Sequence, residues 1–259
     1  MRDIDQALAR AYGRRGTPAQ PGPNNALPTP HFPVEPARPV RPDRDGAIDA
    51  TIGLQWPETV RILEREHGDR FEELADALIE VRDQRRLKVL LFTSCHRAEG
   101  RTSLVLAVAR ALARRPGRTL LVDADLTGPM LARQLGLRPE YGLDDLVDSG
   151  IALAEAVVEA PDDNLSVLPL RAAVARPREF LASAGWSCTM ARLRREYDLV
   201  LLDGSPLFAG LSAAVLHSSV DAAILVRNRT LTGERALLRA REVLDAGGIP
   251  LLGMAETFV

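Results

Sequence analysis

The chain has 259 residues, 46% hydrophobic and 26% charged, with a net charge of −2. This length and composition predict a globular protein with a full core, and the charge gives no reason to expect nucleic acid as a partner. No apolar run approaches the about 20 residues of a membrane span. The charged start at Arg2, Asp3 and Asp5 is unlike a secretory signal, and two cysteines, Cys95 and Cys188, fit a reducing compartment. A cytoplasmic protein is therefore expected.

The amino-terminal segment differs from the rest of the chain. Residues 1–16 are predicted to contain a short amphipathic helix, with Ile4, Leu8 and Tyr12 on its apolar face. Residues 17–50 hold half of the 18 prolines and are predicted to be a disordered linker. A helix on such a tether cannot bury its own apolar face, so it is either a docking peptide for a partner or a frayed terminus.

Residues 51–86 are predicted to form a pair of helices that packs on a sheet. The first helix covers residues 57–67, with proline at its first position and Gly68 after its end. The second begins at Asp69, which forms a capping-box-like start with Glu72.

Residues 87–259 alternate between apolar runs and helical patterns. This alternation, with nearly continuous apolar strands, predicts an α/β domain in which helices sandwich a parallel sheet. Ligands of such sheets bind at the carboxyl ends of the strands. The predicted strands are 88–92, 119–122, 165–168, 199–202, 222–226 and 250–254, and the predicted helices are 102–114, 129–135, 178–196, 211–218 and 232–246.

A short polar loop joins the first of these strands to its helix. The apolar strand ends at Phe92, before Thr93 and Ser94, and Gly100-Arg101-Thr102-Ser103 opens the helix. Strand, loop and helix in this order present backbone N–H groups to an anion. The P-loop pattern G-x-x-x-x-G-K-[ST] would require glycine at Cys95 and lysine at Arg101, so the match is to the architecture and to Gly100 and Thr102.

Two other predicted strands run directly into aspartates. Asp123 and Asp125 follow one apolar run, and Asp203 follows another. Each aspartate alone would fit a helix cap or a turn. Together with the loop they predict a nucleotide site, because Mg²⁺ takes oxygen ligands and is held against phosphates by carboxylates and a Ser or Thr hydroxyl.

Several segments of the chain resemble bacterial tyrosine kinases, within the larger group of Min/Par-type P-loop ATPases. The loop is similar to the family's T-S-x-x-P-G-E-G-K-T, and the first acidic segment to V-D-A-D-L-x-x-P. The second acidic segment resembles Y-D-x-V-I-I-D-T-P-P. The residues that carry the likeness are Thr93-Ser94, Glu99-Gly100-Arg101-Thr102, Leu121 to Leu126 with Pro129, and Tyr197 to Pro206.

The resemblance implies roles for individual residues. ATP would be bound by residues 98–103 of the loop (Ala98, Glu99, Gly100, Arg101, Thr102 and Ser103), and Mg²⁺ by Thr102, Asp125 and Asp203. Asp123 would be the catalytic base, and Arg101 the catalytic cation on the phosphates. The family acts in the cytoplasm beside membrane proteins that control polysaccharide chain length and export, and often assembles into rings.

The chain also departs from the family pattern. Arg101 replaces the phosphate lysine, although 32 of the 33 basic residues are arginine, so a general preference for arginine is one explanation. Ala98 replaces a loop glycine, which disfavours a positive φ there. Thr257 stands where the family often has asparagine for the purine. The carboxyl terminus has no tyrosine, and the oligomerisation motif E-x-x-R-x-x-R is not recognisable.

Three functions remain open on the sequence. The first is an ATP-binding, kinase-like regulator of exopolysaccharide synthesis and export, with a membrane-associated partner that would hold it at the inner membrane. Homo-oligomers are left open under this hypothesis, and ring assembly has no support in the sequence. The second is an adaptor that has lost catalysis and binds nucleotide poorly. The third is a Min/Par-type positioning ATPase, which ranks last because such loops carry an early lysine that is missing between Ser94 and Arg101.

Overall fold

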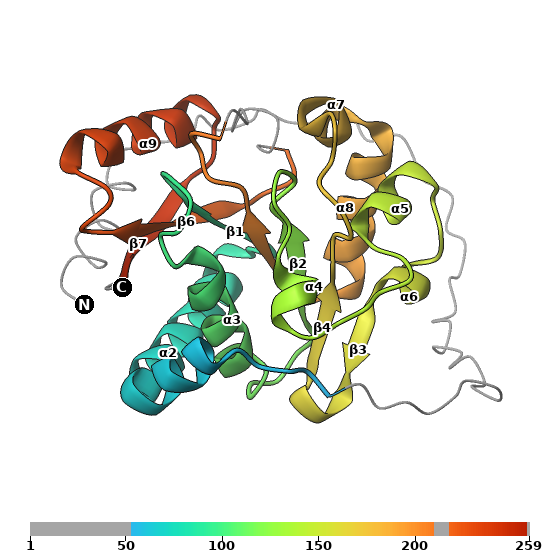
Figure 1. Cartoon of the computed structure of the whole chain (residues 1–259), viewed down its shortest axis with the longest axis horizontal. Helices are drawn as coiled ribbons and strands as arrows, with labels where there is room; N and C mark the ends of the chain where they lie inside the picture. The colour runs from blue at the N-terminus through green and yellow to red at the C-terminus, as the bar shows by residue number, and fades with distance from the viewer. Residues whose placement is uncertain (1–52, 210–217, 258–259) are drawn as a thin grey trace, which may run out of the picture.

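The computed structural model describes residues 53–209 and 218–257. The predicted amino-terminal helix and linker lie outside the described residues, as does nearly all of the helix predicted at 211–218. The described chain forms one sheet with helices on both faces (Figure 1).

The seven-stranded sheet has the order β3-β4-β2-β5-β1-β6-β7. The predicted α/β fold is confirmed, with every neighbouring pair parallel except β3 and β4. The strands are β1 (Val89–Ser94), β2 (Thr119–Ala124), β3 (Val158–Ala160), β4 (Leu165–Leu168), β5 (Leu199–Gly204), β6 (Ala222–Asn228) and β7 (Leu251–Thr257).

The antiparallel strand β3 is not among the strands predicted from the sequence. It is only three residues long and pairs with β4 at the sheet edge. A single 3₁₀ turn (Pro161–Asp163) and Asn164, with φ of 50°, join the two strands. So short a connection leaves no room for a crossover helix, and the second strand must run back along the first.

Alternate residues of the central strands enter two cores, one on each face of the sheet. In β1, Val89 and Leu91 pack on one face, while Leu90 and Phe92 pack on the other. This double burial explains why the strands are continuous apolar runs. The first core is covered by α5 (Leu143–Asp148), α6 (Leu153–Ala156), α7 (Pro177–Ala182), α8 (Ala184–Glu196) and α9 (Glu234–Ala246), and the second by α2 (Glu58–Arg85), α3 (Arg101–Leu112) and α4 (Leu131–Gln134).

The pair of helices predicted between residues 57 and 86 is found as two helical segments of α2, joined at a kink. The kink is at His67, where φ of −136° and ψ of 20° are not helical, and the first helix was predicted to end at this residue. Helix α2 packs chiefly against α3 (Figure 1). Arg115, just after α3, pairs with Glu72 and Asp76 of α2. The domain boundary between residues 86 and 87 stays a prediction.

None of the helices in the described part of the chain is both long enough and apolar enough to cross a bilayer.

Candidate functional site

The candidate site lies where β1, β2 and β5 end side by side. The three strands are parallel and adjacent in the order β2-β5-β1, so their carboxyl ends share one edge of the sheet. Asp123 is paired with Asp203 in the strand register, and Phe92 lies opposite Asp203 on the other side. This register brings the loop after β1 and the acidic ends of β2 and β5 together.

The loop between β1 and α3 is anchored from within by Glu99. Its carboxylate accepts hydrogen bonds from the backbone N–H of His96 at 2.8 Å, from the N–H of Asn228 at 3.3 Å and from the hydroxyl of Thr232. Only 1% of Glu99 is exposed. The position of its carboxylate therefore supports an anchoring role within the loop that was predicted to bind nucleotide.

The turn that enters α3 has two residues with positive φ, Ala98 at 61° and Gly100 at 77°. Gly100 precedes the first residue of α3 and no side chain caps the helix. The first N–H that bonds back within this turn is that of Leu104, to the carbonyl of Gly100. The N–H groups of residues 101–103 are thus left to an outside acceptor, the usual arrangement at an anion site.

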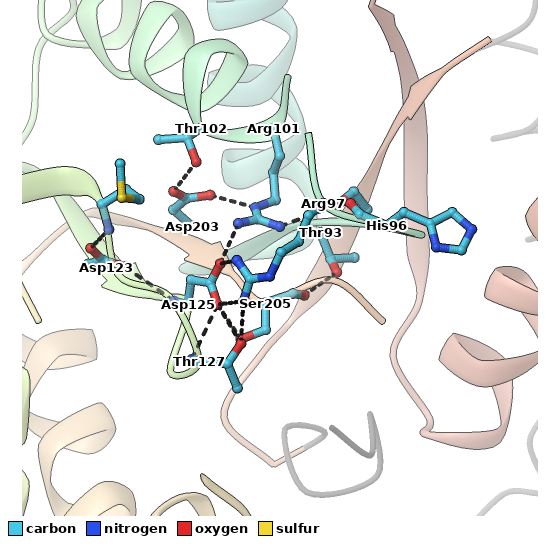
Figure 2. Close-up of polar contacts among 12 residues, drawn as sticks. Thr93, His96, Arg97, Arg101, Thr102, Asp123, Asp125, Thr127, Asp203 and Ser205 are labelled. Carbon is cyan, nitrogen blue, oxygen red and sulfur yellow. Dashed lines mark hydrogen bonds and ion pairs between the residues drawn. The ribbon is translucent and has the colours of Figure 1, made fainter. Parts of the chain in front are cut away.

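Arg101 is the centre of the side-chain network shown in Figure 2. Its Nε donates to Asp203 Oδ1 at 2.8 Å, and its Nη2 donates to Asp125 Oδ2 at 3.0 Å. Its Nη1 lies 3.2 Å from Ser94 Oγ. The guanidinium therefore bridges carboxylates from the ends of two strands, which the sequence did not reveal.

The two carboxylates have further donors. The hydroxyl of Thr102 donates to Asp203 Oδ2 at 2.8 Å, and the hydroxyl of Ser205 donates to Asp125 Oδ1 at 2.9 Å. A second guanidinium, that of Arg97, donates to Asp125 Oδ2 at 3.1 Å and to the hydroxyl of Thr127 at 2.6 Å. Sequence reasoning missed Arg97, whose only signal was a basic side chain within the loop.

Asp123 has a different environment from the other two aspartates. Its Oδ2 accepts the backbone N–H groups of Met130 and Leu131, both at 2.9 Å, at the start of α4. Burial, and then the like charge of Asp203, raise the pKa of Asp123 to about 7. The carboxylate of Asp123, near the end of β2, thus binds the start of α4, and a catalytic role for Asp123 stays a prediction.

The charges of the bridged residues support one another. Burial disfavours the charge on Arg101, but Asp203 and Asp125 outweigh it, and the pKa of Arg101 is raised. Burial also opposes ionisation of Asp125, yet Arg101, Ser205 and Arg97 bring its pKa below the ordinary value. Complete burial raises the pKa of Asp203, with Arg101 as the strongest opposing influence. Arg101 is thus the main partner of both acids.

A cavity of about 230 Å³ opens onto this network. It is smaller than the roughly 300–1,000 Å³ of typical small-molecule pockets, so its size fits a phosphate chain better than a whole nucleotide. His96 is turned away from the network (Figure 2). Its ring lies against that of Phe208, with ring centroids 5.3 Å apart. The cavity is lined by Ser94, residues 97–103, Asp125, Gly128, Met130, Gln134 and Asp203.

The oxygen donors at this cavity fit Mg²⁺ in type. They are the hydroxyl of Thr102 and the carboxylates of Asp125 and Asp203, and Mg²⁺ is commonly held by one or two carboxylates together with substrate phosphates. Among the described residues no group of three or more His, Cys, Asp and Glu side chains forms a metal cage. Mg²⁺ held by these residues would therefore complete its coordination with phosphate or water.

The sheet order, the loop and the open helix start define a P-loop NTPase fold, and comparisons with solved structures agree. The chain is similar to the kinase domain of VpsO, with 25% identity and a TM-score of 0.68 over 76% of this chain and 98% of that one. It is also similar in fold to the septum-site-determining protein MinD of Pyrococcus horikoshii in complex with Mg-ADP. That match has 24% identity and a TM-score of 0.53 over 64% of this chain and 68% of that one.

Sequence comparison gives a more specific result. The tyrosine-protein kinase CpsD of Streptococcus pneumoniae is 28% identical over 173 residues, which are 65% of this chain and 75% of CpsD. Tyrosine-protein kinase YwqD of Bacillus subtilis is 27% identical over 65% of this chain and 71% of its own length. No family model matches the chain. Its homologues are bacterial tyrosine kinases, with MinD-like ATPases as further structural neighbours.

Proposed function

We propose that this chain is an ATP-binding, kinase-like regulator of exopolysaccharide synthesis or export with weak catalytic activity. The observation that carries the proposal is the meeting of three elements at one cavity: the open start of α3, Asp125 directly after β2, and Asp203 near the end of β5. The tyrosine-kinase homologues support the kinase class.

In this proposal the backbone N–H groups of residues 101–103 bind the phosphates, and Arg101 supplies positive charge beside them. Thr102, Asp125 and Asp203 would hold Mg²⁺, which would neutralise phosphate charge when bound. Asp123, with its pKa of about 7, could accept a proton near neutral pH. Its carboxylate is tied to the start of α4, so α4 would have to shift before Asp123 reached a substrate hydroxyl.

A non-catalytic adaptor is the second candidate, and the bridge made by Arg101 favours it, because the phosphate-binding charge is already engaged with two acids. The tyrosines favour it too. Tyr197 is 2% exposed and cannot accept a phosphoryl group in the folded chain, while Tyr141 is 36% exposed. Tyr12 lies outside the described residues. Autophosphorylation would therefore be limited to Tyr141 and Tyr12.

The partner and the location follow from the same resemblance. We propose that a membrane-associated polysaccharide export or chain-length protein binds the chain and holds it at the inner membrane. The amino-terminal helix predicted within residues 1–16 would be the docking peptide. Homo-oligomers stay an open alternative, because the family's oligomerisation motif is not recognisable in this chain. A positioning ATPase is the remaining alternative, supported only by likeness of fold to MinD.

The test of nucleotide binding is titration calorimetry with ATP in the presence of Mg²⁺, alongside thermal denaturation. We expect measurable binding by the wild type, and weaker binding by Asp203→Ala because a predicted metal ligand is lost. Asp148→Ala is the matched control, since Asp148 is an exposed aspartate at the end of α5. No heat and no thermal shift at millimolar ATP would leave the adaptor as the better reading.

Catalysis is tested separately by ATP turnover. If the arginine at position 101 has reduced catalysis, Arg101→Lys should raise ATP turnover. Lysine is a compact cation and cannot give a different nitrogen to each of the two carboxylates. Unchanged or lower turnover would mean that arginine is the working residue of this site.

A further inference from the structure

The acids that would hold Mg²⁺ already have a cation of their own. Arg101 contacts Asp203 at 2.8 Å and Asp125 at 3.0 Å, and 8% of the residue is exposed. The planar guanidinium gives a different nitrogen to each carboxylate, and a lysine ammonium lacks this forked shape. The bridge is therefore a property of this chain's arginine and of the spacing of its two acids.

A divalent cation at this place would need the same oxygens. Asp125 Oδ2 and Asp203 Oδ1 face the guanidinium, and the other oxygen of each carboxylate accepts a hydroxyl, from Ser205 and Thr102 respectively. Like charges a few ångströms apart in a poorly solvated site repel strongly. Mg²⁺ and the guanidinium therefore weaken each other's binding to the carboxylates of Asp125 and Asp203.

We propose that Arg101 is a built-in counter-cation that competes with Mg²⁺ for Asp125 and Asp203. Without nucleotide, the ion pairs with Arg101 prevent the two carboxylates from binding the metal. A phosphate chain in the adjoining cavity offers the guanidinium another anion, and its departure from the acids opens them to Mg²⁺. Loading of the metal thus depends on phosphate. The competition concerns metal alone, whereas its release by phosphate rests on the proposed nucleotide binding.

Arg97 offers a matched comparison, because it also contacts Asp125 Oδ2, at 3.1 Å. Its side chain is 52% exposed, against 9% for Arg101, and it has no contact with Asp203 among the interactions of the described residues. Removing Arg97 leaves the Arg101 bridge in place. Removing Arg101 frees Asp203 and exposes the pair to metal. The two substitutions should therefore differ in their effect on metal binding.

The experiment uses the full chain without nucleotide and Mn²⁺ alone as the probe, with free Mn²⁺ measured by electron paramagnetic resonance. We expect Arg101→Met to bind Mn²⁺ at least about tenfold more tightly than the wild type, because a competing charge next to the site is gone. Arg97→Met should change the affinity less than about threefold, because its charge is half-solvated. Adding Asp203→Asn to Arg101→Met should abolish the gain.

Equal Mn²⁺ affinity of Arg101→Met and the wild type would overturn the proposal, as would an equal gain in Arg97→Met. Should Arg101→Met fail to fold by circular dichroism, Arg101→Lys replaces it. A smaller gain in Mn²⁺ affinity is then expected, because the positive charge stays while the forked guanidinium is lost.

ADP binding tests the release of Arg101 by phosphate. Mg²⁺ should strengthen ADP binding more in the wild type than in Arg101→Lys, because by linkage a phosphate that opens the acids raises Mg²⁺ affinity most where the arginine had closed them. An equal or smaller effect in the wild type would overturn the release step. Absence of ADP binding in every variant, with the Mn²⁺ gain intact, would refute the nucleotide function but not the competition.

Discussion

Replacement of Arg101 by methionine should destabilise the folded chain strongly. Removing one partner of a buried ion pair typically costs about 3–5 kcal/mol, because it leaves a buried charge uncompensated. Here Asp125 would keep Arg97 at 3.1 Å, and Asp203 would keep the hydroxyl of Thr102 at 2.8 Å. We therefore expect the low end, about 3 kcal/mol, which for a domain of 150–250 residues lowers Tm by roughly 6–12 °C.

Urea denaturation measures this cost, with the fluorescence of the buried Trp186 as one probe. Adding Asp203→Asn to Arg101→Met removes the uncompensated charge, so the double variant should be more stable than the sum of the single changes by about 1–3 kcal/mol. Additive effects, or a cost for Arg101→Met below about 1 kcal/mol, would refute the view that the bridge is a strongly coupled buried pair.

The same variant has a defined pH dependence. Burial raises the pKa of Asp203, and Arg101 is the main influence against that rise. Without the arginine, the folded-state pKa of Asp203 lies further above its unfolded value, so the folded state binds the proton more readily. When the folded state raises the pKa of an acid, the free energy of unfolding of the protein increases as the pH falls through that raised pKa. The cost of Arg101→Met should therefore be smaller at pH 5 than at pH 8, and a cost independent of pH would contradict this account.

Two further predictions concern the loop itself. Ala98→Gly should stabilise the fold by about 1 kcal/mol, because Ala98 is exposed and holds a φ of 61° that costs an L-residue about 1–2 kcal/mol. Ala172→Gly, at an exposed position without positive φ, should instead be neutral or slightly destabilising, and equal effects of the two changes in urea denaturation would contradict the strain. Burial, and then the charge of Glu99, raise the pKa of Cys95 to about 11. Iodoacetamide at pH 8 should therefore alkylate the exposed Cys188 and leave Cys95 unmodified. Mass spectrometry that shows both cysteines modified in the folded chain would contradict this prediction.

The sequence predicted the strands well where burial and hydrophobicity coincide. The β1 strand was expected to end at Phe92, but it continues through Thr93 and Ser94, which are buried and pair with Leu225 and Val226 of β6. Polar residues of this kind become strand residues because a neighbouring strand satisfies the hydrogen-bonding groups of their backbone. That neighbour lies about 130 positions away in the chain, so no local pattern contains the information.

The site was predictable at the level of residue types but not of contacts. Aspartates directly after apolar strands must lie at the sheet edge, which is why Asp125 and Asp203 were found. The bridge between them depends on the distance across the sheet from the start of α3, and only the fold sets that distance. Glu99 shows the same limit, because its partners are far along the chain: Asn228 is the last residue of β6, and Thr232 follows that strand.

The shape of the loop bears on the choice between a nucleotide-binding protein and an adaptor without nucleotide. Ala98 keeps a left-handed conformation that favours glycine, and such strain persists only where the surroundings impose it. The surroundings here are the carboxylate of Glu99, which fixes the N–H of His96, and the hydroxyl of Thr257, which donates to the carbonyl of Glu99 at 2.8 Å. An adaptor would gain stability by relaxing this turn. The anchored loop instead keeps the first N–H groups of α3 open toward the cavity, which favours phosphate binding over an adaptor role.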